Sequence, residues 1–192
     1  MENFFQQFVS GQYSFLLKLS IPNEILALLV TILIITIICI CFFVKDNFKR
    51  IKYSSLSISI HYSIFLLCHT LIFRNIKPIP EIKLIPFWSY IDIIKNDQYV
   101  FLYENILNIL LFVPLGFFLS AYLGRNKYWK LVGIGVCISL FIEISQYVFQ
   151  RGLCEFDDLF HNTLGCLIGC CLYIWIEHFI HIHQNMKVEE IN

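Results

Sequence analysis

The stretch that decides the fold and the site of this chain runs Glu143-Ile-Ser-Gln146-Tyr-Val-Phe-Gln150-Arg151-Gly-Leu-Cys-Glu-Phe-Asp157-Asp158-Leu-Phe-His161-Asn162-Thr-Leu-Gly165-Cys-Leu-Ile-Gly169. It places carboxylates, amides and one arginine at the ends of segments that are otherwise apolar enough to span a bilayer. An ionisable side chain at membrane depth is costly and usually serves a function. We therefore expect the functional site in this stretch.

The composition indicates which solvent the fold is built for. Apolar residues make up 58% of the chain and charged residues only 15%, and the mean hydropathy is +0.70. A soluble domain carries roughly a quarter charged residues. The sequence therefore predicts an integral membrane protein. The formal net charge is zero and the basic residues are spread over several loops, which argues against a nucleic-acid partner.

Hydropathy over windows of about 19 residues predicts an all-α membrane protein, a bundle of about five transmembrane helices. The predicted spans are residues 24–44, 56–73, 103–123, 131–149 and 161–179. They form one transmembrane domain over residues 24–180. Residues 1–22 are aromatic but too polar to span, so we expect an interfacial N-terminal segment, and residues 181–192 are predicted to be a cytoplasmic tail.

Two short loops are strongly basic, one from Lys45 to Lys52 and one from Arg125 to Lys130. Short basic loops favour the cytoplasmic side, so the amino terminus is predicted to lie outside and the carboxyl terminus inside. This orientation places the stretch from Glu143 to Asn162 in the outer half of the bilayer.

The polar residues of the bundle fall on three helices at helical spacing. Asn105 and Asn108 share a face of the third helix, Glu143 and Gln146 one of the fourth, and Asp158 and Asn162 one of the fifth. Lipid offers no hydrogen-bond partner, so these faces are expected to meet one another. Gly165 and Gly169 continue the stripe of the fifth helix and are typical of close helix packing. Pro114 is expected to bend the third helix beside Asn108.

Cysteines and histidines give little sign of a metal or cofactor. Seven of the eight cysteines lie within predicted spans, where a thiol behaves as a small hydrophobe, and no two pairs have the spacing of zinc ligands. Of the histidines, only His161 joins the polar stretch. We therefore expect neither a metal site nor a cofactor.

These motifs together resemble the VanZ-like family of bacterial membrane proteins. The resemblance covers roughly residues 56–180 and rests on Leu84-Ile-Pro86-Phe87, Glu104-Asn105-Ile-Leu-Asn108-Ile-Leu-Leu-Phe112-Val-Pro114-Leu-Gly116, Glu143-x-x-Gln146, Arg151, Asp157-Asp158 and Asn162-x-x-Gly165-x-x-x-Gly169. Lys83 and Trp88 depart from the family pattern. The resemblance implies a multi-pass protein of the bacterial cell membrane. It also implies a link to glycopeptide resistance of the teicoplanin type, but no reaction.

Our first hypothesis is a pocket in the outer leaflet that binds an amphiphile, with Phe112, Phe117 and Phe141 beside its tail. The ligand would be a membrane lipid, a lipid-linked wall precursor or the fatty tail of a lipoglycopeptide. Arg151 presents a donor fork suited to phosphate or carboxylate. The predicted ligand-binding residues are Asn105, Asn108, Glu143, Gln146, Arg151, Asp158 and Asn162.

The alternative is an intramembrane enzyme acting on a lipid head group or a lipid-linked wall precursor, with Glu143, Asp157, Asp158 and His161 as acid–base groups. The sequence shows no nucleophile or metal set beside them, which makes this reading the less favoured. A solute or proton pathway is a third hypothesis. A purely structural reading also stays open, in which Glu143 pairs with Arg151 and Asp158 caps the fifth helix.

Overall fold

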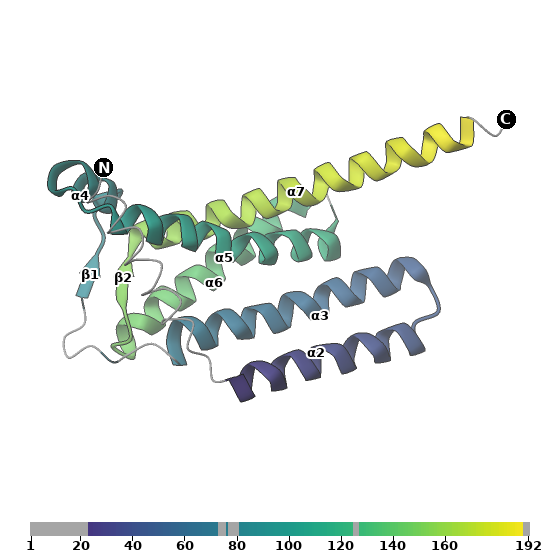
Figure 1. Ribbon diagram of the computed structural model, residues 1–192, viewed down its shortest axis with the longest axis horizontal. Helices are drawn as coiled ribbons and strands as arrows, with labels where there is room; N and C mark the ends of the chain where they lie inside the picture. The colour runs from purple at the N-terminus through teal and green to yellow at the C-terminus, as the bar shows by residue number, and fades with distance from the viewer. Residues whose placement is uncertain (1–22, 73–75, 77–80, 125–126, 190–192) are drawn as a thin grey trace.

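The computed structural model describes residues 23–72, 76, 81–124 and 127–189, and it is an all-α bundle (Figure 1). Five of its helices are long and apolar enough to cross a membrane. They are α2 (Asn23–Phe43), α3 (Asn47–Leu67) with its π-helical continuation η1 (Cys68–Ile72), α5 (Val100–Leu123), α6 (Tyr128–Val148) and α7 (Phe156–Glu189). The five predicted spans are therefore confirmed. The predicted interfacial segment, residues 1–22, lies outside the described residues.

The predicted start of the second span, at Leu56, is wrong by nine residues, because α3 begins at Asn47. The carboxylate of Asp46 accepts a hydrogen bond of 2.9 Å from the amide of Lys49 and caps the helix. Arg50 donates two bonds back to the carbonyl of Val44. Lys49, Arg50 and Lys52 therefore lie on the first turns of α3, and only Lys45 of this basic stretch lies in the connection from α2. At the other terminus α7 continues past the predicted span to Glu189.

Three short elements that the sequence did not predict gather at one end of the bundle. They are β1 (Glu81–Lys83), α4 (Trp88–Asn96) and β2 (Leu153–Glu155). The two strands pair in parallel with Ile82 opposite Cys154. Figure 1 shows them beside the first turns of α5 and α7, whereas the connection from α2 to α3 lies at the opposite end. We call β1, α4, β2 and the adjoining ends of α5, α6 and α7 the polar end.

The core of the bundle depends on close contact between α5 and α7. A methyl group on Gly165 would collide with the carbonyl oxygen of Ile109, and one on Gly169 would collide with that of Val113. Gly116 of α5 faces the backbone of Cys166 in the same way. The predicted close approach at Gly165 and Gly169 is therefore confirmed. The buried core around this contact consists of Leu66, Phe112, Leu115, Leu119, Leu131, Ile142, Cys166 and Cys170.

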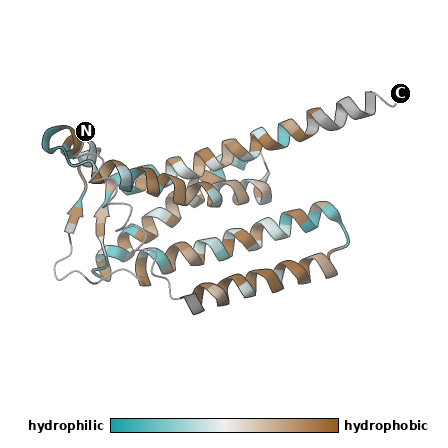
Figure 2. Ribbon diagram, viewed as in Figure 1, coloured by the Kyte–Doolittle hydropathy of each residue, from teal (hydrophilic) through white to brown (hydrophobic). Residues whose placement is uncertain are grey.

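Helix α2 lies at the edge of the bundle against α3 and is apolar along almost its whole length (Figure 2). No residue in the most apolar part of α2 is buried inside the protein. A helix this apolar is stable at the edge only where lipid surrounds it. The core described above is therefore built without α2.

Pro114 lies inside α5 and leaves the carbonyl of Leu110 without its usual amide donor. One residue further on, the carbonyl of Leu111 accepts a hydrogen bond of 2.7 Å from the hydroxyl of Tyr62. A side chain of α3 thus contacts the α5 backbone at the turn that the proline weakens, and α5 continues to Leu123.

We expect Gly169→Leu to destabilise the protein by about 1 to 3 kcal/mol, because the added side chain must push the backbones of α5 and α7 apart. Gly133→Leu is the matched control, since nothing lies within 4 Å of a Cβ at this exposed position of α6. Thermal unfolding in detergent micelles measures both variants. Equal stability of the two variants would contradict the packing described here.

The orientation predicted from the basic loops can be tested by thiol labelling in a variant that lacks the natural cysteines. We expect Asn47→Cys and Lys127→Cys to be protected from an impermeant maleimide added to whole cells, and Asp97→Cys, after α4, to be labelled. Labelling at Lys127 with protection at Asp97 would reverse the orientation and place the polar end in the cytoplasm.

Candidate functional site

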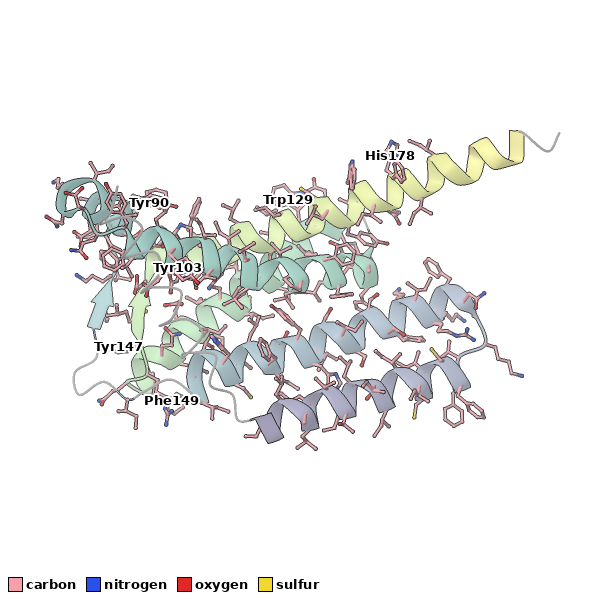
Figure 3. The ribbon with its side chains drawn as sticks, in the orientation of Figure 1. Tyr90, Tyr103, Trp129, Tyr147, Phe149 and His178 are labelled. Atoms are coloured by element: carbon pink, nitrogen blue, oxygen red, sulfur yellow. The ribbon has the colours of Figure 1, made fainter. Side chains whose placement is uncertain are left out.

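The predicted polar residues of three helices meet at the polar end. Figure 3 places Tyr90, Tyr103, Tyr147 and Phe149 at the same end. Asn105, Glu143, Gln146, Asp157, His161 and Asn162 are buried there, and Asn108, Arg151 and Asp158 are half-buried. The hydrogen bonds that these side chains make divide them into groups with different roles.

The stripe on α7 is bonded to a different helix on each side. The amide nitrogen of Asn108 on α5 donates to Asp158 Oδ1 at 2.6 Å. The amide nitrogen of Asn162 donates to the hydroxyl of Ser139 on α6 at 2.8 Å. The expectation that the polar faces of these helices meet one another is confirmed for these pairs. Ser139 was missed because a serine inside an apolar helix carries no distinctive signal.

The carboxylate of Glu143 accepts a hydrogen bond of 2.9 Å from the backbone amide of Glu155, so it holds β2 against α6. The pKa of the thiol of Cys154, the preceding residue in β2, responds to the surrounding charges. Burial raises the pKa of its thiol first, and the negative charges of Glu143, Glu155 and Asp158 raise it further. Three carboxylates of the polar end therefore act on the thiol of Cys154 in β2.

Gln146 and Arg151 donate to the carboxyl end of η1. Arg151 Nη1 lies 2.6 Å from the carbonyl oxygen of Ile72 and 3.3 Å from that of Leu71. The amide of Gln146 makes a longer contact of 3.5 Å with the carbonyl of Thr70. The last carbonyls of a helix have no partner within it, and these two side chains supply donors.

Asp157 caps α4 from another helix. Its carboxylate accepts hydrogen bonds from the amides of Phe87 and Ser89, at 2.5 and 3.0 Å, and from the hydroxyl of Ser89 at 2.5 Å. Asn105 donates to the same hydroxyl at 3.1 Å. Phe87 has a φ of 59°, a conformation that is strained for an aromatic residue. This cap, which we call the Asp157 cap, fixes how the chain enters α4.

His161 is fully buried one turn beyond Asp157, and its Nε2 lies 2.8 Å from the hydroxyl oxygen of Tyr90 on α4. The rings of Phe87 and Phe160 pack beside them, with centroids 5.3 Å apart. No feature of the sequence singled out Tyr90. Among the described residues, no three His, Cys, Asp or Glu side chains lie close enough together to hold a metal ion.

Two of the three rings predicted beside the ligand tail lie elsewhere. Phe112 is 2% exposed and belongs to the core, so it does not line an open pocket as expected. Phe117 packs edge-on against Tyr173, further along the bundle. Phe141 is exposed on α6.

Comparison with known proteins matches the sequence to a family. The model of the family described as VanZ/LLP1 matches residues 26–177. The protein named Protein VanZ from Enterococcus faecium is 30% identical over 70 residues, which are 36% of this chain and 44% of that protein. The match thus spans less than half of the length of that relative. No solved structure matches the chain.

We expect Asp157→Ala to release the start of α4. Hydrogen bonds to a charged acceptor contribute about 1.5 to 3 kcal/mol each, so amide hydrogen exchange at residues 88–92 should accelerate by at least tenfold. Asp97→Asn, at the far end of α4, is the control that leaves the cap intact. Unchanged protection of these amides in Asp157→Ala would show that the cap does not hold α4.

Proposed function

Because the chain belongs to the VanZ/LLP1 family and is a multi-pass membrane protein, we propose that it acts in the bacterial cell envelope by binding an amphiphile at its polar end. The consequence proposed for the cell is lowered susceptibility to glycopeptides of the teicoplanin type. The observation that carries the proposal is a network of polar side chains between α5, α6 and α7, in which half-buried Asn108 and Asp158 bond to each other and buried Asn162 bonds to buried Ser139.

The bond between Asn108 and Asp158 is not the only contact that joins α5 and α7. Contacts at Gly116, Gly165 and Gly169 already bring α5 and α7 together over their backbones. Polar side chains inside an apolar bundle are expensive unless each finds a partner, and they are usually kept for a function. The bonds of Asn108 with Asp158 and of Asn162 with Ser139 join side chains, so a ligand can replace them without stranding a backbone group.

The charges favour a particular head group. The negative charges of Glu143, Glu155 and Asp158 act on Cys154 in β2, and Arg151 Nη1 donates to backbone carbonyls. A head group rich in phosphate would be repelled by these carboxylates, whereas amines and hydroxyls would be attracted. We therefore propose a head group that presents hydrogen-bond donors to Asp158, in place of the phosphate or carboxylate expected opposite Arg151.

The polar end also offers apolar surface to the tail of the ligand. Phe87, Phe156 and Phe160 are each more than a third exposed there, and Phe87 touches Phe160. Partly exposed rings at the same end of the bundle as a polar network suit a molecule with a polar head and an apolar tail. Membrane lipids, a lipid-linked wall precursor and the fatty tail of a lipoglycopeptide all have this form.

An enzyme acting on a lipid head group or a lipid-linked wall precursor is the second candidate, and the contact between Tyr90 and His161 favours it. A hydroxyl 2.8 Å from a buried imidazole is arranged for proton transfer. Asp157 contributes less to such a role, because its oxygens accept three hydrogen bonds from the start of α4. Tyr90→Phe separates the two candidates, since it removes the transferable proton and leaves the Asn108–Asp158 network in place.

We expect expression of the protein in a sensitive Gram-positive host to raise the minimum inhibitory concentration of teicoplanin, with little change for vancomycin. Asp158→Asn should abolish most of the protection, because it removes the charge that attracts donors while keeping the shape of the side chain. Asp92→Asn on α4 is the matched control. Membrane levels of each variant are compared by immunoblot.

Four outcomes test the proposal and separate the two candidates. Equal protection against both drugs would contradict a role for the tail, and full protection by Asp158→Asn would contradict the network. Protection that is lost in Tyr90→Phe but kept in Asp158→Asn would favour the enzyme. Protection kept in Tyr90→Phe and lost in Asp158→Asn supports binding.

A further inference from the structure

We propose that residues 82–95, from β1 through α4, form a lipid-binding anchor that lies on the membrane surface at the polar end. We call this stretch the anchor segment. It does not depend on the proposed function, because it concerns the lipid bilayer as a partner rather than a ligand of the buried network.

The anchor segment exposes apolar side chains along its whole length. Its exposed apolar side chains are Ile82, Leu84, Ile85, Phe87, Ile91 and Ile94. Ile94 is 81% exposed, and Leu84 and Ile85 are each about two-thirds exposed, at 65% and 66%. Clusters of this kind on one short segment mark an interaction surface.

The opposite face of the segment is held by the protein. Trp88 and Ser89 are buried, and the Asp157 cap bonds Ser89 to α7. The ring of Trp88 packs edge-on against Phe101 of α5, with centroids 4.8 Å apart. Because one face is fixed against α5 and α7, the exposed face has a fixed direction and does not turn inward.

The position of the segment along the bundle matches the membrane surface. It directly precedes α5, which starts at Val100, and it contacts the first turns of α7, which starts at Phe156. Tyr147 and Phe149, at the end of α6, are exposed at the same end (Figure 3). Exposed aromatic side chains at the ends of spanning helices are typical of the interface between lipid and water.

The apolar surface of the segment is continuous with that of a spanning helix. Phe87 touches Phe160, which is itself 43% exposed on α7. Lys83 and Lys95 lie near the two ends of the segment, and the ammonium of Lys83 rests 4.9 Å from the ring centroid of Trp88. Apolar side chains flanked by lysines are typical of segments that lie in the interface, where lysines reach the head groups. The occupant is therefore the bilayer itself.

The test uses the full chain in vesicles made of equal parts phosphatidylglycerol and phosphatidylethanolamine. A photoreactive benzoylphenylalanine replaces Ile94 or Ile85, one at a time, and adducts are identified by mass spectrometry. We expect lipid adducts from both positions. The matched control replaces Asn96, two residues from Ile94 and bonded to Asp92, where lipid adducts should be several-fold fewer.

Protein adducts in place of lipid adducts at Ile94, whether to a second copy or to another region of the chain, would overturn the proposal. Lipid adducts of equal yield at Ile94 and Asn96 would also overturn it, because they would show no preferred face.

A paired substitution provides a second measurement. Ile91→Asp with Ile94→Asp should reduce the lipid adducts from position 85 several-fold, since two charges must leave the interface. Asn96→Asp adds a charge nearby and should leave the yield unchanged. Thermal unfolding in detergent checks that each variant folds. If the paired variant folds and keeps full adduct yield, the apolar face does not anchor the segment.

Discussion

The contact between the backbones of α5 and α7 determines where the polar side chains of the site lie. Gly116, Gly165 and Gly169 leave no room for a side chain between the two helices, so their relative rotation is fixed. This rotation brings Asp158 opposite Asn108 and turns Asn162 toward Ser139. In a bilayer, where apolar burial gives little force between helices, such contacts and hydrogen bonds hold a bundle together.

The polar residues that share this end have different roles. Gln146, Arg151 and Asp157 bond to backbone groups at the ends of η1 and α4, and any substitution there exposes a helix end. Asn108 and Asn162 bond to side chains, which exchange partners more readily. A sequence motif does not separate these roles, because a polar side chain near the end of a helix can bond to a backbone group or to another side chain.

The sequence predicted the parts of the fold that depend on local composition. Hydropathy located five spans, and the spacing of Asn108, Asp158 and Asn162 predicted that their helices face one another. It missed the elements whose partners are distant. The start of α4 is set by a carboxylate 70 residues away, and β1 pairs with a strand that follows α6. It placed the start of α3 too late because that turn is polar.

The separation in sequence between the partners at the polar end has a consequence for biosynthesis. The amides of Phe87 and Ser89 bond to Asp157, Asn108 bonds to Asp158, and the carbonyl of Ile72 accepts a bond from Arg151. Arg151, Asp157 and Asp158 are all translated after α6. As the chain is inserted from its amino terminus, α4 therefore has no cap until translation has reached the start of α7. A nascent chain truncated before residue 157 contains four of the spanning helices but not the carboxylate that caps α4, so the polar end cannot assemble before the start of α7 has been made.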